Sequence, residues 1–243
     1  RWESGLRRGH SFTPRKFMSQ KSKRFRAALA KTEAKGVYPI AEAIALLKEL
    51  TGARFDESVE AHIKLGIDPK KSDQTVRGLT TLPHGTGKTL RIAAFTESQQ
   101  KEAKTAGAFI VGGKELVEEI AKSQKINFDI AVATTDFMKE LTKIAKVLGV
   151  KGIMPSPKNG TAVTEAAAAI KKLHGGQITF RNDDSGNIHQ IVGKVSWEAK
   201  KLEENILVFL GEIRKLRPKG VKGSFIQRIT VCSTMGPGIK IQP

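Results

Sequence analysis

The hydrophobic pattern of this chain changes character twice, and the parts before and after the middle resemble each other. Residues 58–65 alternate apolar and polar side chains, as in a strand with one open face, and this pattern returns after residue 176. Between them, short apolar strands at 90–95, 109–111 and 130–133 alternate with helical stretches. Such alternation predicts a parallel sheet flanked by helices. We therefore predict an α/β protein of two domains, in which a Rossmann-like domain is inserted into a discontinuous α+β outer domain.

Glycine-rich segments mark both places where the pattern changes. Gly85 lies in the first and Gly175-Gly176 lie in the second. Two adjacent connections with permissive backbone torsions predict a hinge between the domains. The expected division is a basic extension over 1–37, an outer domain over 38–85 plus 176–243, and an inserted domain over 86–175.

The remaining helices and strands are predicted from the periodicity of apolar residues and from the proline and glycine residues that end them. Pro39 and Gly52 bound one amphipathic helix, and a long one carries its apolar stripe after residue 200. A short basic helix is expected around 23–35. Further strands are expected at 178–181, 188–195, 225–232 and 239–241, and helices of the insert near 99–106, 114–123, 136–148 and 163–173.

The charge balance indicates a polyanionic partner. The chain of 243 residues has 42 Lys and Arg against 24 Asp and Glu, a net charge of +18. The last thirty residues carry seven basic and no acidic side chains, and they include the glycine-rich turn 233–238. A positive surface with bare backbone suits RNA, because phosphate neutralisation releases counterions. The alternative is a basic protein whose charge serves only solubility.

Two short segments offer the residue types that bind RNA without reading a groove. Phe55 could stack on a base or ribose, with Arg54 on a phosphate and Ser58 on a 2′-hydroxyl. Phe55 could equally cap the core. If Ser58 and Thr234 lie on adjacent strands, two hydroxyls and a glycine backbone form an RNA platform. Two more residues would flank it: Lys222 and Ser224.

Enzymatic chemistry finds little support in the sequence. The run 85–89 resembles the end of a phosphate-binding loop, but Leu82 stands where that motif needs glycine and a strand follows instead of a helix. The five histidines are scattered, and we expect them at turns or on the surface. The single cysteine, Cys232, excludes a disulfide or a multi-cysteine zinc cluster, and we expect it to be a small buried residue. We predict no enzyme, metal, cofactor or small-molecule substrate.

The amino-terminal residues 1–17 are rich in arginine and poor in acid. They read either as a leftover before a native start at Met18 or as an organellar transit segment. No apolar run approaches the ~18 residues of a membrane span, so no membrane partner is expected.

Several long motifs occur in an order that identifies a family. From about residue 21 to 243 the chain resembles the bacterial form of the L-one family of large-subunit ribosomal proteins. The resemblance rests on residues 54–60 (RFDESVE), 65–69 (LGIDP), 82–85 (LPHG), 154–161 (MPSPKNGT), 180–183 (FRND) and 233–237 (STMGP). Ser58 stands where threonine is common and Ser156 where asparagine is frequent, and residues 1–17 lie outside the pattern.

The resemblance implies a two-domain protein of the ribosome with a Rossmann-like insert. It implies binding to the large-subunit rRNA stalk beside the exit site, help in releasing deacylated exit-site tRNA, and repression of the protein's own operon messenger RNA. A cytoplasmic ribosome is expected, with an organellar one as the alternative. The alternative is that the protein acts mainly as a messenger-binding translational regulator. The RNA contacts implied by position are Phe55, Glu57, Ser58, Thr234, Met235 and Gly236, with Lys222 and Ser224 as weaker candidates and Gly85, Gly175 and Gly176 near the hinge.

Overall fold

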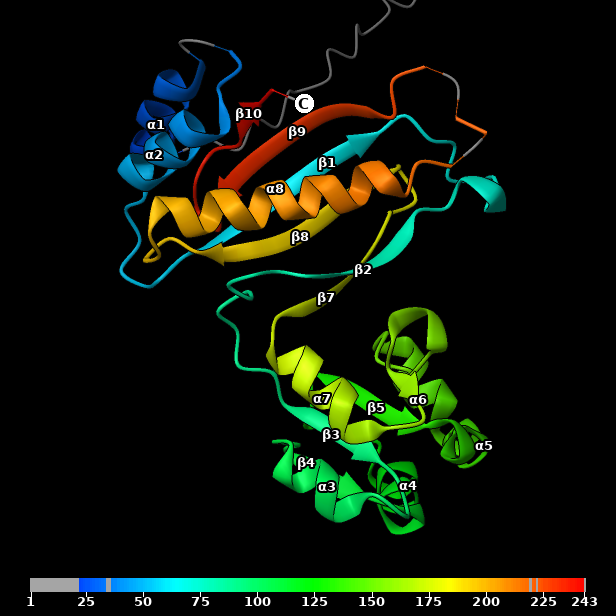
Figure 1. Ribbon diagram of the computed structural model, residues 1–243. Helices are drawn as coiled ribbons and strands as arrows, with labels where there is room; N and C mark the ends of the chain where they lie inside the picture. Colours follow the sequence, from blue (N-terminus) through cyan, green and yellow to red (C-terminus); the bar gives the residue numbers. More distant parts are fainter. Residues whose placement is uncertain (1–21, 34–35, 219, 222, 243) are drawn as a thin grey trace, which may run out of the picture.

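The computed structural model describes residues 22–33, 36–218, 220–221 and 223–242, and these form two lobes (Figure 1). The outer lobe is built on a four-stranded sheet of order β10-β9-β1-β8, and the inserted lobe on a four-stranded sheet of order β4-β3-β5-β6. A two-stranded ribbon, β2-β7, connects them. Two parts of the sequence prediction lie outside the described residues: the amino-terminal segment 1–17 and the candidate RNA contact Lys222.

The sheet of the outer lobe is antiparallel and has one open face. Its strands are β1 (Ser58–Leu65), β8 (Asn187–Lys194), β9 (Ile226–Ser233) and β10 (Ile239–Ile241). Every second residue of β1 is buried, as the alternating sequence predicted. Helices α2 (Ile40–Leu50) and α8 (Ala199–Lys215) pack on the buried face, and α1 (Lys23–Glu33) lies beside α2.

The long helix α8 supplies much of this core. Its stripe Leu202, Ile206, Phe209 and Ile213 is completely buried, in agreement with the predicted amphipathic helix. Fully burying such side chains stabilises the fold by roughly 1.5–3 kcal/mol each. The open face of the sheet is thereby left as the side on which polar chemistry can be arranged.

The sheet of the inserted lobe is parallel throughout, which confirms the predicted α/β fold class. Its strands are β3 (Ile92–Phe95), β4 (Ile110–Gly112), β5 (Ile130–Thr134) and β6 (Ala162–Val163). Along β3, Ile92 and Ala94 face α3 (Gln100–Thr105) and α7 (Ala166–His174), whereas Ala93 and Phe95 face α4 (Lys114–Ser123). Both faces are covered, so the strands are apolar without alternation.

One predicted helix of the insert is interrupted. Residues 136–148 form short 3-10 turns around α5 (Met138–Leu141) and α6 (Ala145–Val150) instead of one helix. Ile144, with φ −110° and ψ 8°, leaves the helical torsions just before α6. Phe137, Leu141, Ile144 and Leu148 are nevertheless all buried, so the apolar spacing was interpreted correctly and the regular helix was not.

The ribbon between the lobes was missing from the sequence prediction. Strand β2 (Arg77–Thr81) pairs antiparallel with β7 (Gln177–Arg181), and only β7 was expected. The β2 segment carries no clear apolar alternation. Its one buried residue is the polar Thr80, and Arg77 and Thr81 at its ends are exposed. Pairing with a strand a hundred residues away decides its conformation.

The two connections cross next to each other at paired glycines. Gly85 and Gly176 have φ of +67° and +93°, whereas Gly175 has an ordinary φ of −72°. The Leu82 N–H donates to the Gly176 carbonyl at 3.1 Å. Fully buried Asn205 of α8 donates to the carbonyls of Gly85 and Val192, and its side-chain oxygen accepts from the His84 N–H. The Asn205 side chain therefore holds the connection that leads into the inserted lobe against strand β8 of the outer sheet.

Replacing Gly176 with alanine is expected to destabilise the crossing. A Cβ there would lie 2.6 Å from the Gly85 Cα and 2.9 Å from the Leu82 carbonyl oxygen, and the positive φ adds strain of about 1–3 kcal/mol. Urea unfolding should show a loss of at least that size. The control is Gly211→Ala inside α8, where nothing lies within 4 Å of the added Cβ and a gain of up to about 1 kcal/mol is expected. Equal stability of the two variants would contradict this account.

Candidate RNA interface

The segment before β1 and the turn after β9 lie side by side at one end of the open sheet. Val59 pairs with Ser233, and the Thr234 N–H donates to the Ser58 carbonyl at 3.1 Å. The Ser58 N–H in turn donates to the Thr234 hydroxyl at 3.0 Å. Ser58 and Thr234 are therefore neighbours, which the sequence left as a condition, although 176 residues separate them in the chain.

Glu57 is buried between these two segments. Its side chain is 1% exposed, and its carboxylate accepts hydrogen bonds from the Met235 N–H at 3.0 Å and the Ala53 N–H at 3.2 Å. Burial alone would raise the pKa of the carboxyl. The hydrogen bonds from Met235, Ser233 and Ala53, together with the charge of Arg24, outweigh burial and lower that pKa below its ordinary value. Glu57 therefore holds the 234–236 turn against the 53–58 segment.

Two large apolar side chains point to solvent at this place. Phe55 is 55% exposed and Met235 53% exposed, and Arg54 beside Phe55 is exposed as well. The sequence left open whether Phe55 caps the core, and its exposure argues against that alternative. A single exposed apolar side chain is ordinary, but apolar side chains that gather at one place on a surface are typical of binding sites.

The glycine of the turn is required by close packing. A Cβ on Gly236 would lie 2.5 Å from the Ser233 hydroxyl oxygen, and the Gly236 N–H already donates to the Ser233 carbonyl. A side chain at this position would have to displace the Ser233 hydroxyl, which also hydrogen-bonds to Glu57. The backbone at the tip of the turn is therefore bare beside Met235, as close approach of a sugar-phosphate chain requires.

The end of β8 completes the site with residues that sequence reasoning missed. The Lys194 ammonium donates to the Ser58 hydroxyl at 3.0 Å. Asp56 accepts from the backbone and the hydroxyl of Ser196, at 3.2 and 3.0 Å. These contacts depend on the β1–β8 register, which no local signal in residues 194–196 specifies. We call the residues Arg54–Ser58, Lys194 and Thr234–Gly236 the junction face.

Ser224 does not join the junction face. It lies just before β9 begins, whereas Thr234 follows the end of the strand, and its hydroxyl donates to the Ile226 carbonyl. The backbone there approaches Gly66, at the far end of β1 from Ser58. The sheet therefore separates Ser224 from the other candidates by the length of a strand.

Two histidines lie on the open face of the outer sheet, which agrees with the expected surface positions, whereas the cysteine differs from the expectation. His62 on β1 and His189 on β8 are cross-strand partners, and their side chains are 29% and 54% exposed. Cys232 is only partly buried and faces the open side of the sheet, whereas its neighbours Val231 and Ser233 are buried. The spacing within each strand was visible in the sequence, but the register that brings these three side chains together was not.

The inserted lobe touches the ribbon through a proline-rich loop, residues 154–161. The Arg77 guanidinium donates to the Asn159 side-chain oxygen at 2.9 Å, and a Cβ on Gly160 would lie 3.2 Å from Leu79. A cavity of about 650 Å³ lies between the lobes, lined by both crossing connections and by this loop. The run 85–89 lines it as a connection that leads into β3, so the strand predicted after Thr89 is confirmed.

A family model spans both lobes. The model of the ribosomal protein L1p/L10e family matches residues 47–237, which include the whole insert and the junction face. The chain belongs to this family. Proteins of the L1p/L10e family are structural components of the ribosome and not enzymes, which agrees with the expectation from the broken phosphate-loop motif.

Curated family members match nearly the whole chain. The large ribosomal subunit protein uL1 of Mycoplasma capricolum subsp. capricolum is 48% identical over 225 residues, which cover 93% of this chain and 100% of that protein. The uL1 proteins of Kosmotoga olearia and Alcanivorax borkumensis are 46% and 44% identical, over 92% and 93% of this chain and 97% and 98% of their own lengths. Among the described residues no helix has the length and apolar character to cross a membrane.

Proposed function

We propose that this chain is a constituent of the large ribosomal subunit and binds large-subunit rRNA of the 23S type at the mobile stalk through the junction face. The observation that carries the proposal is that Phe55 and Met235, two exposed apolar side chains, stand on two segments that the hydrogen bonds of Glu57 and Thr234 join. A rigid surface costs little ordering entropy on binding.

Recognition would depend on RNA shape and sugars. Phe55 stacks on a base or ribose, and Met235 packs beside it where the bare Gly236 backbone admits the chain closely. The Ser58 hydroxyl accepts from Lys194 and keeps its own hydrogen to donate to a 2′-hydroxyl. Arg54 and Lys194 contact phosphates. Glu57, being buried, acts by positioning the Met235 turn.

A salt series with Thr234→Ala tests this assignment. Losing the hydroxyl removes the bond from the Ser58 N–H and loosens the turn, so affinity for stalk rRNA should fall about fivefold, or ~1 kcal/mol, at every salt concentration. Because the side chain is uncharged, the slope of log affinity against log salt should not change. Lys194→Gln should instead lower that slope by about 0.7–0.9, the value of one phosphate contact.

The control lies in the other lobe. Lys158→Ala removes a charge from the proline-rich loop of the insert, and stalk rRNA binding should remain close to wild type. Wild-type binding by Thr234→Ala, or an equal loss in Lys158→Ala, would place the RNA elsewhere.

The insert would serve exit-site tRNA. With the outer lobe fixed on rRNA at a cytoplasmic ribosome, the glycine crossing would let the inserted lobe take different positions while deacylated tRNA leaves, and the Arg77–Asn159 contact would hold one of these positions. Arg77→Ala should shift the distribution of distances between spin labels placed on α4 and α8. An unchanged distribution would argue against a hinge at this contact.

The same face would bind the protein's own operon messenger and so repress translation. Both RNAs would then need Met235 and Phe55, and they would compete. Stalk rRNA is expected to displace a leader-messenger fragment from the chain. Equal or tighter binding of the messenger would favour the alternative, in which messenger regulation is the main activity.

A further inference from the structure

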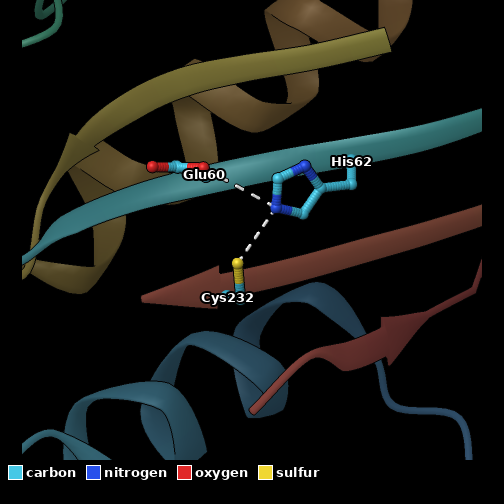
Figure 2. Close-up of side chains that lie close together, drawn as sticks. All are labelled: Glu60, His62 and Cys232. Carbon is cyan, nitrogen blue, oxygen red and sulfur yellow. Dashed lines mark hydrogen bonds and ion pairs between the residues drawn. The ribbon is translucent and has the colours of Figure 1, made fainter. Parts of the chain in front are cut away.

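A cluster of possible metal ligands lies on the open face of the outer sheet, next to the junction face. Glu60 and His62 stand two residues apart on β1, and Cys232 reaches them from β9 (Figure 2). The His62 Nε2 lies 3.0 Å from the Cys232 Sγ and 3.7 Å from a Glu60 carboxylate oxygen. All three potential ligand atoms lie within 4.8 Å of one another.

The two separations from His62 are close to what a tetrahedral ion requires, and the ligand atoms of Glu60 and Cys232 lie within 4.8 Å of each other. Zinc binds nitrogen, oxygen and sulfur at roughly 2.0–2.3 Å, so two of its ligands stand about 3.3–3.6 Å apart. The observed 3.0 and 3.7 Å reach that range through small side-chain rotations. Rigid neighbouring strands hold the three Cβ atoms, so binding would require little backbone movement.

The second nitrogen of His62 is already engaged in the manner that metal-bound histidines show. Its Nδ1 lies 2.8 Å from the His189 Nδ1, and the His189 Nε2 lies 3.5 Å from an Asp183 carboxylate oxygen. With Asp183 ionised, His189 donates from Nε2 and accepts at Nδ1. His62 then donates from Nδ1, which leaves the Nε2 lone pair directed at Cys232 and Glu60. Such an outer chain fixes the tautomer of a ligating histidine.

The empty cluster and the occupied one are related by a simple exchange. Without metal, the Cys232 S–H donates to the His62 Nε2. A divalent ion takes the place of that proton: the sulfur and the nitrogen each give a lone pair to the ion, Glu60 supplies an oxygen, and the thiol proton leaves to solvent. A hollow of about 420 Å³ lined by His62, His189 and Thr230 gives solvent access beside the cluster.

The donor set selects the ion by chemical class. One thiolate, one imidazole and one carboxylate are poor ligands for magnesium or calcium, which prefer oxygen alone. Zinc accepts all three types and tolerates a site with three protein ligands and a water. We propose that Glu60, His62 and Cys232 bind Zn²⁺ on the open face of the sheet, with the fourth position left to water and His189 as a positioning residue.

Cobalt substitution tests the site on the full chain without RNA, so its result is independent of the proposed function. Titrating the reduced protein with Co²⁺ should give a near-ultraviolet sulfur-to-metal charge-transfer band with a stoichiometry of one, and Zn²⁺ should abolish it. Because Cys232 is the single cysteine of the chain, this band assigns the ligand. Absence of the band, or binding without saturation, overturns the proposal.

Matched variants separate ligands from bystanders. Cys232→Ser should lose the band, and calorimetry with Zn²⁺ should show more than about 100-fold weaker binding by Cys232→Ser and His62→Ala, a larger effect than removing an outer partner. His189→Ala should keep the band with roughly 10–100-fold weaker affinity. In His189→Gln the side-chain oxygen can still accept from the His62 Nδ1–H, so this variant should recover most of the lost affinity. Circular dichroism checks that each variant is folded.

The control is the same substitution at a distant histidine. His174 contacts the Gly107 carbonyl in the inserted lobe, and His174→Ala should bind Zn²⁺ like wild type. If Cys232→Ser or His62→Ala also binds Zn²⁺ like wild type, the ion lies elsewhere and the proposal is wrong.

Discussion

Met235→Asp is expected to weaken binding of stalk rRNA roughly 100-fold. The side chain is half-exposed, so the variant should fold normally. Its apolar contact with RNA, worth about 1–2 kcal/mol, is lost. A carboxylate among phosphates adds repulsion of about 1 kcal/mol or more, and the sum approaches the 2.7 kcal/mol of a hundredfold change. A gel-shift titration at fixed salt measures the effect.

A matched charge change controls for the general loss of positive potential. Val150 is 86% exposed in the inserted lobe, and Val150→Asp makes the same substitution far from the junction face. It should weaken binding no more than about twofold, since exposed charges beyond a Debye length of ~8–10 Å are screened. Equal losses in the two variants would mean that net charge, and not the Met235 surface, governs affinity.

Glu57→Gln is expected to cost about 1–3 kcal/mol of folding stability at pH 7. The carboxylate accepts two backbone hydrogen bonds in a buried position, and an amide can turn only one oxygen to them. One N–H, of Ala53 or Met235, then loses its acceptor. Urea unfolding at pH 7 measures the loss, and rRNA affinity should fall with it because the Met235 turn loosens.

The effect should depend on pH with a definite sign. The pKa of Glu57 is lowered in the folded protein from its ordinary value of 4.5, so the unfolded chain takes up the proton first as pH falls. The stabilisation by the ionised group is complete above pH 4.5 and is lost as pH falls through the lower folded value. The stability difference between wild type and Glu57→Gln should therefore be largest at neutral pH and shrink below pH 4.5.

An exposed glutamate supplies the comparison. Glu97 is 57% exposed and lies 3.4 Å from Lys114, and a surface pair of this kind contributes less than about 1 kcal/mol. Glu97→Gln should change the free energy of unfolding by only a few tenths of a kcal/mol, both at pH 7 and below pH 4.5. A loss as large as that of Glu57→Gln would show that burial is not the cause.

Local patterns were sufficient wherever one element decides its own conformation. The alternation in 58–65 predicted β1, the apolar run 90–95 predicted the strand β3, which begins two residues later at Ile92, and the stripe of α8 predicted its buried face. The interrupted helix near Ile144 and the ribbon strand β2 were missed because tertiary packing, and not propensity, sets their torsions. The same reason explains why Lys194 and Ser196 were absent from the predicted site.

The sequence by itself determined the class of the fold, the insertion of one lobe into the other, and the two segments that carry Phe55 and Met235. Only the tertiary structure decided that Glu57 is a buried acceptor, that Ser224 lies at the far end of the sheet, and that His62 meets His189 and Cys232 across 127 and 170 residues. Periodicity specifies which face a side chain occupies. Strand register specifies its neighbours, and register is fixed by packing between segments that are distant in the chain.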